Sequence, residues 1–306
     1  MVDYFAQVSD EFLEENKLTK SASNFVSRSR VDELAAASEI IAVFAGDNAR
    51  NAAEAVSRLR GRAAFAGNIG ADEEGRIIKE NLNAVGIESF LEIALGNTGK
   101  IITFITPDKE RSFAVNLGNS TEYYKLPLEE ATDSKYFYYT SISVLGKHRL
   151  ADTIKHTVDE LNGEAWIALS LESPPMIKEH RKELLGLIGK SDIVFANEYE
   201  LTSLTGKGIN ESVDEIGELV ELLYIKLGEK GSLAVYKGKT ENIPAYTAQP
   251  IDLTGAGDFY AGGVLQALSS GKGFKQAGSI GSFIGARVVE QLGARLPELV
   301  LPTRLG

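Results

Sequence analysis

The sequence of 306 residues contains no cysteine and only three histidines. The absence of cysteine excludes disulfide bonds, thiolate nucleophiles and the zinc or iron–sulfur sites that cysteine builds. His148, His156 and His180 are not spaced as in the His-Glu-x-x-His motif of zinc enzymes. We therefore expect neither a cysteine-based site nor a histidine metal site.

The sequence also has no run of about 18 apolar residues, which a membrane-spanning helix would need. Its first five residues, Met1 to Phe5, do not show the basic-then-apolar order of a secretory signal peptide. We therefore predict a cytoplasmic protein without a membrane partner, and the lack of cysteine is compatible with that compartment.

The sequence has fewer basic than acidic residues. It contains 32 Lys and Arg and 43 Asp and Glu, which gives a formal net charge of −11. Nucleic-acid-binding proteins usually carry a basic face, so we expect no nucleic-acid partner. This balance does not exclude a small phosphorylated ligand, since local backbone N–H groups can hold a phosphate. With 43% hydrophobic residues, the chain has enough apolar material for one folded domain over residues 1–306.

Two kinds of segment alternate along the chain. Short apolar runs at 166–169 and 193–196 are typical of buried strands. Amphipathic segments at 177–188 and 213–223 are typical of helices. This alternation predicts an α/β fold in which a mainly parallel central sheet is flanked by helices on both faces.

One region interrupts the alternation. From residue 87 to about residue 124, the sequence indicates strands without helices. Segments 100–105 and 111–115 are apolar and are joined by the polar turn 107–110, which predicts a hairpin. We interpret this region, with part of residues 1–30, as a small β lid that closes over an active site. The alternative is a surface hairpin without such a role.

A glycine-rich segment near the C-terminus precedes an apolar helical pattern. Gly255, Ala256 and Gly257 should therefore form the first turn of a helix, where small side chains let a phosphate approach the backbone N–H groups. Asp258 lies in the same turn. A carboxylate there would repel phosphate, which favours a role as the base that deprotonates an attacking hydroxyl. The alternative is an aspartate that only stabilises the helix N-terminus.

Two further glycines, Gly262 and Gly263, lie inside the same helical pattern, although a glycine there costs about 1 kcal/mol. We therefore expect the helix to pack closely against another element or a ligand. Other phosphate-binding motifs do not fit. A dinucleotide-binding pattern would need glycine where Tyr260 stands, and a P-loop would need glycine where Leu184 stands.

The segment from Asp252 to Asp258 reads Asp-Leu-Thr-Gly-Ala-Gly-Asp and resembles the C-terminal signature of the PfkB carbohydrate kinases, Asp-Thr-x-Gly-Ala-Gly-Asp. Only Leu253 departs from it. The resemblance implies a ribokinase-like fold and an ATP-dependent phosphotransferase. It implies an anion hole for the transferred phosphate and Asp258 as the base; the anion hole would consist of Gly255, Ala256 and Gly257. It also implies a nucleotide-binding surface that comprises Lys226, Gly228, Gly231, Thr254, Gly255 and Gly257.

Asn197 and Glu200 follow a predicted strand and resemble the Asn-x-x-Glu motif of this family, which orders Mg²⁺ and its waters near the phosphates. Magnesium prefers few protein ligands and several waters. We favour this role over the alternative in which Asn197 only caps the following helix. Asp252 is the candidate for a monovalent cation such as K⁺, which some relatives bind.

Two other segments occur in the order expected of the family. Residues 226–232 resemble its Leu-Gly-x-x-Gly loop, which borders the nucleotide in relatives; the alternative is a plain hairpin turn. Residues 67–75 resemble a Gly-x-x-Gly-x-Asp-x-x-Gly segment that we interpret as structural. The resemblance therefore covers nearly the whole chain.

The substrate side departs from the family pattern. Asp3 aligns with an aspartate that grips sugar hydroxyls, but the strand before it is absent, so we expect further residues upstream. The substrate loop is usually Gly-Gly-x-x-x-Asn. Here Gly46 and Asn51 are kept, and Asp47 replaces the second glycine. Either Asp47 accepts a hydrogen bond from the substrate or it blocks the close approach that glycine permits. Asp3 and Asn51 would hold ribose hydroxyls.

Segments 8–16, 97–100 and 170–181 resemble the adenosine-kinase-like branch. We therefore predict phosphoryl transfer to a primary hydroxyl of a ribosyl molecule, a nucleoside such as adenosine first. A sugar such as ribose or fructose is the alternative acceptor. A non-catalytic nucleotide or sugar sensor is the alternative from another class, and the intact Asp258 weighs against it. Relatives include monomers and lid-mediated dimers, and the sequence does not choose between them.

Overall fold

The computed structural model describes residues 1–123, 126–296, 298, 301–302 and 305. Its chain divides into two units. Unit 1 comprises Met1–Asp47 and Phe65–Tyr123, and unit 2 comprises Asn48–Ala64 and Tyr124–Gly306. Residue 124, at which the predicted lid ends, lies outside the described residues. In the part that the structure describes, no helix is both long and apolar enough to cross a membrane.

Six strands form the sheet of unit 2: β8 (Tyr136–Thr140), β9 (Trp166–Ser170), β10 (Ile193–Asn197), β11 (Leu222–Lys226), β12 (Ser232–Tyr236) and β13 (Lys239–Ile243). Their order is β13-β12-β11-β10-β9-β8. From β8 to β11, neighbouring strands are parallel, whereas β12 and β13 are antiparallel to their neighbours. The predicted mainly parallel sheet is confirmed.

The helices of unit 2 are α3 (Asn48–Arg58), α5 (Leu128–Thr132), α6 (Ser141–Val144), α7 (Arg149–Glu160), α8 (Pro174–Glu179), α9 (Arg181–Ile188), α10 (Glu198–Thr205), α11 (Ile209–Gly217), α12 (Ala256–Ser269) and α13 (Phe274–Val288), with a short 3₁₀ helix, η1 (Gly228–Lys230). The predicted helix at 177–188 is two helices, α8 and α9, which meet at His180. The first of them begins earlier than predicted, at Pro174, because proline is favourable in the first turn of a helix. The predicted helix at 213–223 is wrong at its end, because Leu222 begins β11. Short apolar runs do not distinguish helix from strand.

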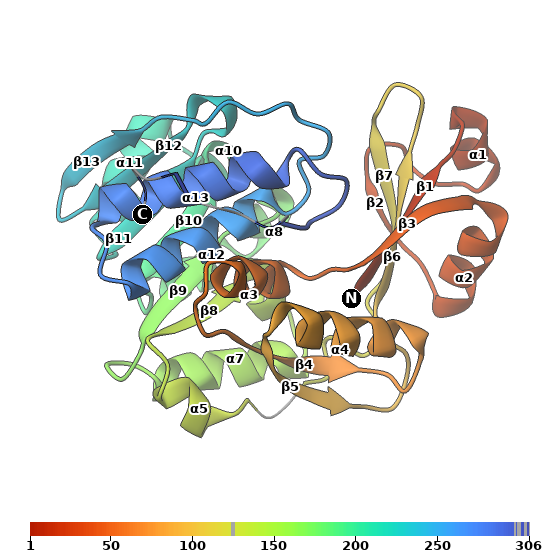
Figure 1. The fold of residues 1–306 in the computed structure, drawn as a ribbon, viewed down its shortest axis with the longest axis horizontal. Helices are drawn as coiled ribbons and strands as arrows, with labels where there is room; N and C mark the ends of the chain where they lie inside the picture. Colours follow the sequence, from red (N-terminus) through yellow and green to blue (C-terminus); the bar gives the residue numbers. More distant parts are fainter. Residues whose placement is uncertain (124–125, 297, 299–300, 303–304, 306) are drawn as a thin grey trace. The chain divides into compact units, whose positions relative to one another are not determined.

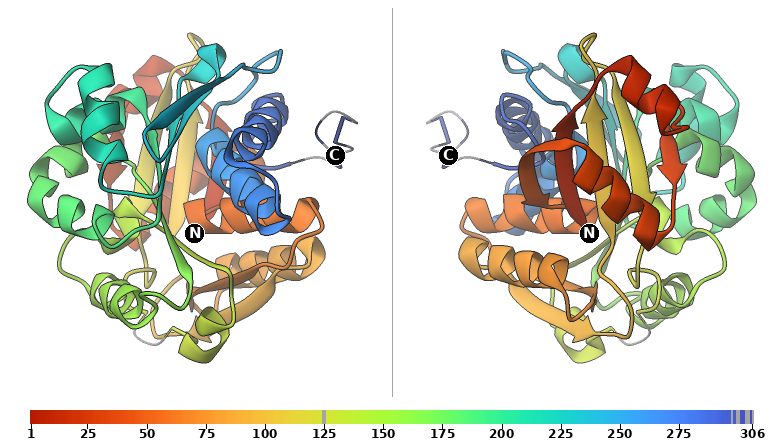
Figure 2. Two further views of the ribbon diagram at one scale, coloured as in Figure 1. Left: turned by 90° about the vertical axis from the view of Figure 1, so that its left-hand side faces the viewer. Right: turned by 90° about the vertical axis from the view of Figure 1, so that its right-hand side faces the viewer.

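Side chains of this sheet alternate between two cores, as the pleat of a strand requires. In β10, Ile193 and Phe195 lie in a core with α3, α12 and α13, while Val194 and Ala196 lie in a core with α7, α9, α10 and α11. Figure 1 shows helices on both faces of the sheet, and Figure 2 shows α12 and α13 side by side. The predicted coverage of both faces is confirmed.

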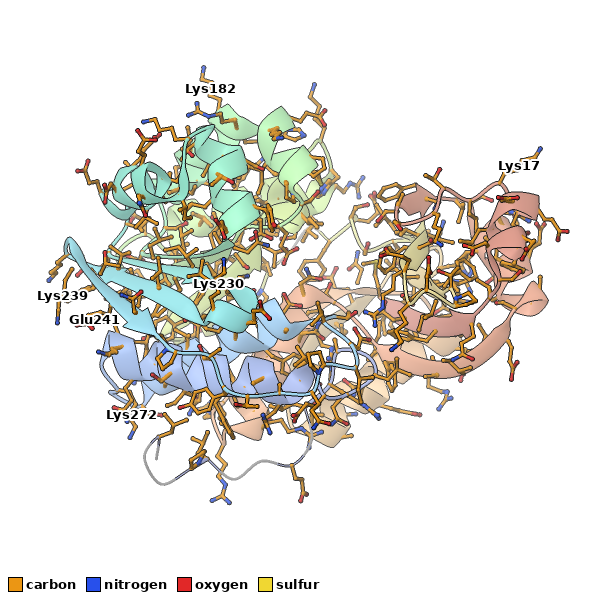
Figure 3. The ribbon with its side chains drawn as sticks, turned by 90° about the horizontal axis from the view of Figure 1, so that it is seen from above. Lys17, Lys182, Lys230, Lys239, Glu241 and Lys272 are labelled. Atoms are coloured by element: carbon orange, nitrogen blue, oxygen red, sulfur yellow. The ribbon has the colours of Figure 1, made fainter. Side chains whose placement is uncertain are left out.

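The edge strand β13 carries charged side chains. Glu241 pairs with Lys239 on the same strand at 2.6 Å and with Lys275 on α13 at 2.8 Å. The hydrogen bonds from these two lysines lower the pKa of Glu241 to about 2. Figure 3 labels Lys239 and Glu241 at this edge, where charged groups discourage the addition of a strand from another chain.

Unit 1 contains a five-stranded sheet of β1 (Val2–Gln7), β2 (Ser23–Phe25), β3 (Glu39–Ala45), β6 (Lys100–Ile105) and β7 (Arg111–Asn116), in the order β2-β7-β6-β1-β3. The antiparallel pair β6 and β7 confirms the predicted hairpin. The strands β1 and β2 come from residues 1–30, as predicted for the lid, whereas β3 lies outside the residues that were predicted for the lid. A separate pair consists of β4 (Ala64–Ile69) and β5 (Glu88–Ile93), so β5 does not join the larger sheet.

The helices of unit 1 are α1 (Asp10–Glu15), α2 (Arg28–Ala37) and α4 (Glu73–Val85). Leu13 of α1 and Leu34 of α2 pack against Ile102 and Phe104 of β6, so α1 and α2 cover one face of the five-stranded sheet. From residue 87 to residue 123 the chain has strands and no helix, as the sequence predicts, whereas the N-terminal part of unit 1 adds α1 and α2.

Asp3 lies inside a strand. It is the second residue of β1 and pairs with Phe44 of β3 and with Ile101 of β6. The sequence-based expectation placed Asp3 after a missing strand, so its own participation in a strand is a correction. The expectation of further residues upstream stays a prediction.

Candidate active site

Three neighbouring parallel strands of unit 2 deliver charged residues to one edge of the sheet. Glu172 follows β9, Glu200 follows β10, and Lys226 is the last residue of β11. Because these strands are adjacent and parallel, their carboxyl ends meet, which is where open α/β sheets bind ligands. Coulombic interactions of Glu172 with Asp258, Lys226 and Glu200 show that the four groups share one neighbourhood.

The helix α12 begins at the glycine-rich segment, as predicted. Gly255 precedes its first residue and has a φ of 76°, a conformation that glycine adopts without strain. A Cβ atom on Gly257 would lie 3.0 Å from the Nζ of Lys226. The ammonium of Lys226 therefore lies beside the helix N-terminus, and both features attract a phosphate.

Asp258 lies in the first turn of α12 and is only 9% exposed. Its Oδ2 accepts a hydrogen bond from the Nδ2 of Asn51, at 2.9 Å. Asn51 belongs to α3, so two segments far apart in sequence meet here. The structure thus brings one predicted substrate-binding residue directly to the predicted base.

Arg50 fixes the orientation of Asn51. One guanidinium nitrogen, Nη2, donates to the Oδ1 of Asn51 at 2.5 Å and to the carbonyl of Ala294 at 3.3 Å, and Nη1 donates to Glu54 at 2.7 Å. Since the amide oxygen of Asn51 faces Arg50, its amide nitrogen faces Asp258. Arg50 is 1% exposed, and its ion pair with Glu54 compensates the buried charge.

Asp252, the predicted monovalent-cation residue, is 1% exposed. Its Oδ1 accepts a hydrogen bond from the N–H of Thr254 at 2.7 Å, and its Oδ2 accepts one from the N–H of Gly293 at 2.8 Å. The carboxylate therefore shapes the loop that leads into α12. The cation role of Asp252 and the nucleotide role of Thr254 stay predictions.

Asn197 and Glu200 form a capping box at the start of α10. The Oδ1 of Asn197 accepts from the N–H of Glu200 at 2.8 Å, and the Oε2 of Glu200 accepts from the N–H of Asn197 at 2.7 Å. The helix cap, the alternative to a metal role, is therefore present. Burial raises the pKa of Glu200, and the positive charge of Lys226 opposes that rise. A carboxylate and an amide oxygen offer further lone pairs, so the magnesium role stays a prediction.

The segment 226–232 is a hairpin turn in the structure. Strands β11 and β12 pair antiparallel, and η1 joins them. Gly228 and Gly231 both have positive φ, 61° and 94°, and a Cβ atom on Gly231 would lie 2.0 Å from the carbonyl of Ile243. The alternative of a plain hairpin turn is thus correct as geometry. The nucleotide role of Lys226, Gly228 and Gly231 stays a prediction.

Three predicted substrate-binding residues lie in unit 1. A Cβ atom on Gly46 would lie 2.4 Å from the Oδ2 of Asp3, so the carboxylate of Asp3 lies against the backbone of Gly46. Asp47 has a φ of 108°, a conformation that favours glycine, and it stands where the resemblance expects glycine. The structure therefore groups Asp3, Gly46 and Asp47 at the junction of β1 and β3.

Sequence reasoning missed three charged side chains of this site. Arg50 and Glu54 are separated by one turn of α3, a spacing that indicates an ion pair but not its burial. Glu172 belongs to a segment that the sequence identified only as part of a scaffold. The available signal was that Glu172 directly follows a buried strand, as Glu200 does, while Lys226 ends another.

A carboxylate at the start of a helix that attracts phosphate, beside a lysine, is the arrangement that phosphoryl transfer to a hydroxyl group requires. The description "pfkB family carbohydrate kinase" matches residues 21–300. The chain belongs to this family.

Known proteins similar to this chain differ in substrate. It is 31% identical to a probable fructokinase-2 of Arabidopsis thaliana, over 71% of this chain and 70% of the relative. The solved adenosine kinase of Sinorhizobium meliloti is 28% identical with a TM-score of 0.87, covering 96% and 93% of the two chains. A ribokinase of Thermotoga maritima is 20% identical with a TM-score of 0.74, covering 96% and 91%. The fold is therefore ribokinase-like, as predicted, and the chain is a sugar or nucleoside kinase.

Proposed function

We propose that this protein transfers the γ-phosphate of ATP to a primary hydroxyl of a ribosyl small molecule, a nucleoside such as adenosine first. The observation that carries the proposal is the position of the Asp258 carboxylate. It lies in the first turn of α12, accepts a hydrogen bond from the Asn51 amide and is close to Lys226. The likeness to an adenosine kinase over 96% of the chain supports the nucleoside.

Kinases of this family use ATP with a divalent metal. Within the described residues, no group of three or more His, Asp or Glu is placed to hold a metal ion. A sparse site still fits Mg²⁺, which keeps most of its waters and relies on substrate phosphates. Asn197 and Glu200 would hold it through water, and the ion would neutralise phosphate charge.

The side chains of unit 2 have separate tasks in the proposed reaction. Asp258 takes the proton of the attacking hydroxyl, and Asn51 holds the carboxylate in one orientation. The backbone N–H groups of Gly255, Ala256 and Gly257 stabilise the charge that develops on the phosphate, together with Lys226. The family resemblance assigns Asp3, Gly46 and Asp47 to acceptor binding, and this role stays a prediction.

A sugar kinase of the same family is the second candidate, with ribose or fructose as the acceptor. The observation that favours it is the 31% identity to a probable fructokinase-2. Both candidates predict the same base and the same nucleotide site, so the acceptor alone distinguishes them.

The test is ADP release in the presence of ATP and Mg²⁺ with adenosine, other nucleosides, ribose and fructose as acceptors. We expect turnover with one ribosyl compound. The Asp258→Asn variant should lose on the order of 10²- to 10⁴-fold in kcat, because it lacks the base. Asp192→Asn, which changes a carboxylate directly before β10, is the control for a general effect of charge removal. Undiminished kcat in Asp258→Asn, or no turnover with any acceptor, would contradict the proposal.

A further inference from the structure

Helix α3 carries two buried charges that the reaction described above does not use. Arg50 is 1% exposed and Glu54 is 3% exposed, and the Nη1 of Arg50 lies 2.7 Å from the Oε2 of Glu54. Taking two charges out of water costs about as much as their attraction returns, so an apolar pair of similar volume often stabilises a protein equally well. The stability of α3 alone therefore does not require this ion pair.

The guanidinium of Arg50 leaves the Asn51 amide one orientation. An arginine side chain has only donors, so the group that it faces must be an acceptor, and its Nη2 faces the Oδ1 of Asn51 at 2.5 Å. The Nδ2 of Asn51 then donates to Asp258. If the amide were turned over, Nδ2 would face the donors of Arg50 and Oδ1 would face the carboxylate, and both contacts would be repulsive. Arg50 therefore selects the orientation that holds Asp258.

The same nitrogen of Arg50 binds the turn that follows α13. Nη2 donates to the carbonyl of Ala294 at 3.3 Å. A Cβ atom on Gly255 would lie 2.5 Å from the Cβ of Ala294 and 3.3 Å from the Nδ2 of Asn51. The turn, the Asn51 amide and the start of α12 thus meet at one point, and Arg50 donates to the first two.

Glu54 holds the guanidinium in turn. Its Oε2 accepts a hydrogen bond from Arg50, and its Oε1 accepts one from the Nε of Arg58 at 3.3 Å. The three residues are spaced four apart, so they lie along one side of α3. The Arg58 side chain is 34% exposed, and a partly exposed pair contributes little. We therefore expect the larger effect from the inner pair of Arg50 and Glu54.

We propose that Arg50 is a positioning residue for phosphoryl transfer, which acts on Asp258 through Asn51 and touches neither ATP nor the acceptor. Glu54 supports this role because it fixes the guanidinium. The role rests on the proposed function, in which Asp258 is the base. A base takes a proton efficiently only within hydrogen-bond reach of the hydroxyl, so a carboxylate that can turn freely is less often productive. The alternative is an ion pair that only stabilises α3.

The first test replaces the whole ion pair, so that no buried charge is left unpaired. The double variant Arg50→Met/Glu54→Leu has apolar side chains of similar size and should remain folded. We expect its kcat to fall about 10- to 100-fold and its KM for ATP to change less than about twofold, because the nucleotide site keeps its residues. ADP release measures both constants, and urea unfolding measures stability. Arg62→Met, at an exposed residue after α3, is the control.

The single variant Arg50→Lys gives a second measurement that leaves Glu54 with a cation. Lysine keeps the charge but lacks the planar fork of donors, so it cannot hold Glu54 and Asn51 at once in the same geometry. We expect its kcat to fall as well, at nearly unchanged stability. If both variants are folded and keep the kcat of wild type, the ion pair is only structural and the proposal is overturned.

A double-mutant cycle shows whether the effect passes through Asn51. In an Asn51→Ala background, Arg50→Lys should cost no further kcat, because the orientation of the amide is then already lost. If the two losses multiply instead, Arg50 acts by another route and the proposal is overturned.

A measurement without turnover follows the Asn51 amide itself. In protein labelled with ¹⁵N in asparagine side chains, the pair of amide signals that is missing from Asn51→Ala belongs to this residue. We expect these protons to exchange slowly with solvent in the wild type, because the amide is buried and donates to Asp258. In Arg50→Lys the signals should shift and exchange faster. Signals that do not change would overturn the proposal.

The two proposals fail in different ways. If wild type releases no ADP but the Asn51 signals depend on Arg50, the kinase proposal fails and Arg50 still orients Asn51. If wild type releases ADP and the Arg50 variants keep its kcat, the kinase proposal stands and the positioning role of Arg50 fails.

Discussion

Asp47 is the residue whose backbone most clearly conflicts with its side chain. A φ of 108° is unusual for a residue with a Cβ atom, and Asp47 stands where the family resemblance expects glycine. Such positions cost about 1–3 kcal/mol and occur mainly where function retains them. The strained conformation therefore favours the interpretation in which the carboxylate of Asp47 accepts a hydrogen bond from the substrate. An aspartate without such a role would be easily replaced by glycine, which adopts this φ without strain.

We expect Asp47→Gly to raise the free energy of unfolding by about 1 kcal/mol, because glycine adopts this φ freely. The same change should raise the KM for the acceptor if the carboxylate binds it. Asp47→Asn is the matched control, because it removes the charge and keeps the strain. Denaturant unfolding and steady-state kinetics measure the two effects. If the Gly variant is less stable than the Asn variant, the backbone at position 47 is not strained.

The position of Asp258 at the start of a helix could be predicted from the sequence, and its surroundings could not. Asp258 lies in a contiguous motif whose glycines and acid follow from the chemistry of phosphate at a helix N-terminus. Arg50 contacts Ala294 and Glu172 interacts with Asp258, so each has a partner more than 80 residues away that only the folded chain shows. For Asn197 and Glu200, one residue pattern fits both a helix cap and a metal site, so the sequence could not decide between them.

Among the elements, α12 and α3 approach most closely at a glycine. A Cβ atom on Gly262 would lie 2.1 Å from the carbonyl of Ala52 and 2.7 Å from the Cβ of Ala55. The close packing expected from the two helical glycines is confirmed, and its partner is α3 (Figure 1). This packing sets the distance between the helix that carries Asn51 and the helix that carries Asp258.

We expect Gly262→Ala to destabilise the protein by about 1–3 kcal/mol, because the methyl group overlaps backbone atoms that cannot move aside. The change should also lower kcat more than the ATP affinity, since it displaces Asn51 from Asp258. Gly263→Ala is the control, because its Cβ would meet atoms at 3.2–3.3 Å and the better helix propensity of alanine offsets that contact. Equal stability of the two variants in thermal unfolding would contradict this prediction, because it would show that α3 moves aside to accommodate the methyl group.

The sequence predicted the main elements more reliably than their limits. Parallel strands buried on both faces are short apolar runs, so β9 and β10 were identified within a residue or two. The apolar start of β11 was mistaken for the end of a helix, because a run of that length fits both. The place of β3 in the five-stranded sheet depends on pairing with β1, which no local pattern encodes.

For the whole molecule, Glu172 makes stability depend on pH. Its pKa is raised well above the usual value in the folded state, chiefly by burial. Between the unfolded and folded pKa values, the unfolded chain has released this proton and the folded chain still holds it. The contribution of Glu172 to the free energy of unfolding is therefore fully present below the ordinary pKa of glutamate. It is lost as the pH rises through the pKa that Glu172 has in the folded state.

We expect Glu172→Gln to become more stable relative to wild type as the pH rises above the ordinary glutamate value, by about 1.4 kcal/mol per pH unit. The gain should stop once the pH exceeds the folded pKa. Urea unfolding of both proteins at a series of pH values, without ligand, measures the difference. A difference that is constant with pH would mean that Glu172 ionises normally. Glu179→Gln, at an exposed residue of α8, serves as the control.

The hydrogen bond between Asn51 and Asp258 joins residues 207 positions apart, and this separation governs when the site can form during synthesis. At about 5–20 residues per second, α3 waits roughly 10–40 s on the ribosome before α12 has been made. Until then the small-residue face of α3 has no partner. Every chain that stops before α12 lacks Asp258, so under the proposed function incomplete translation products of this length are inactive from the outset.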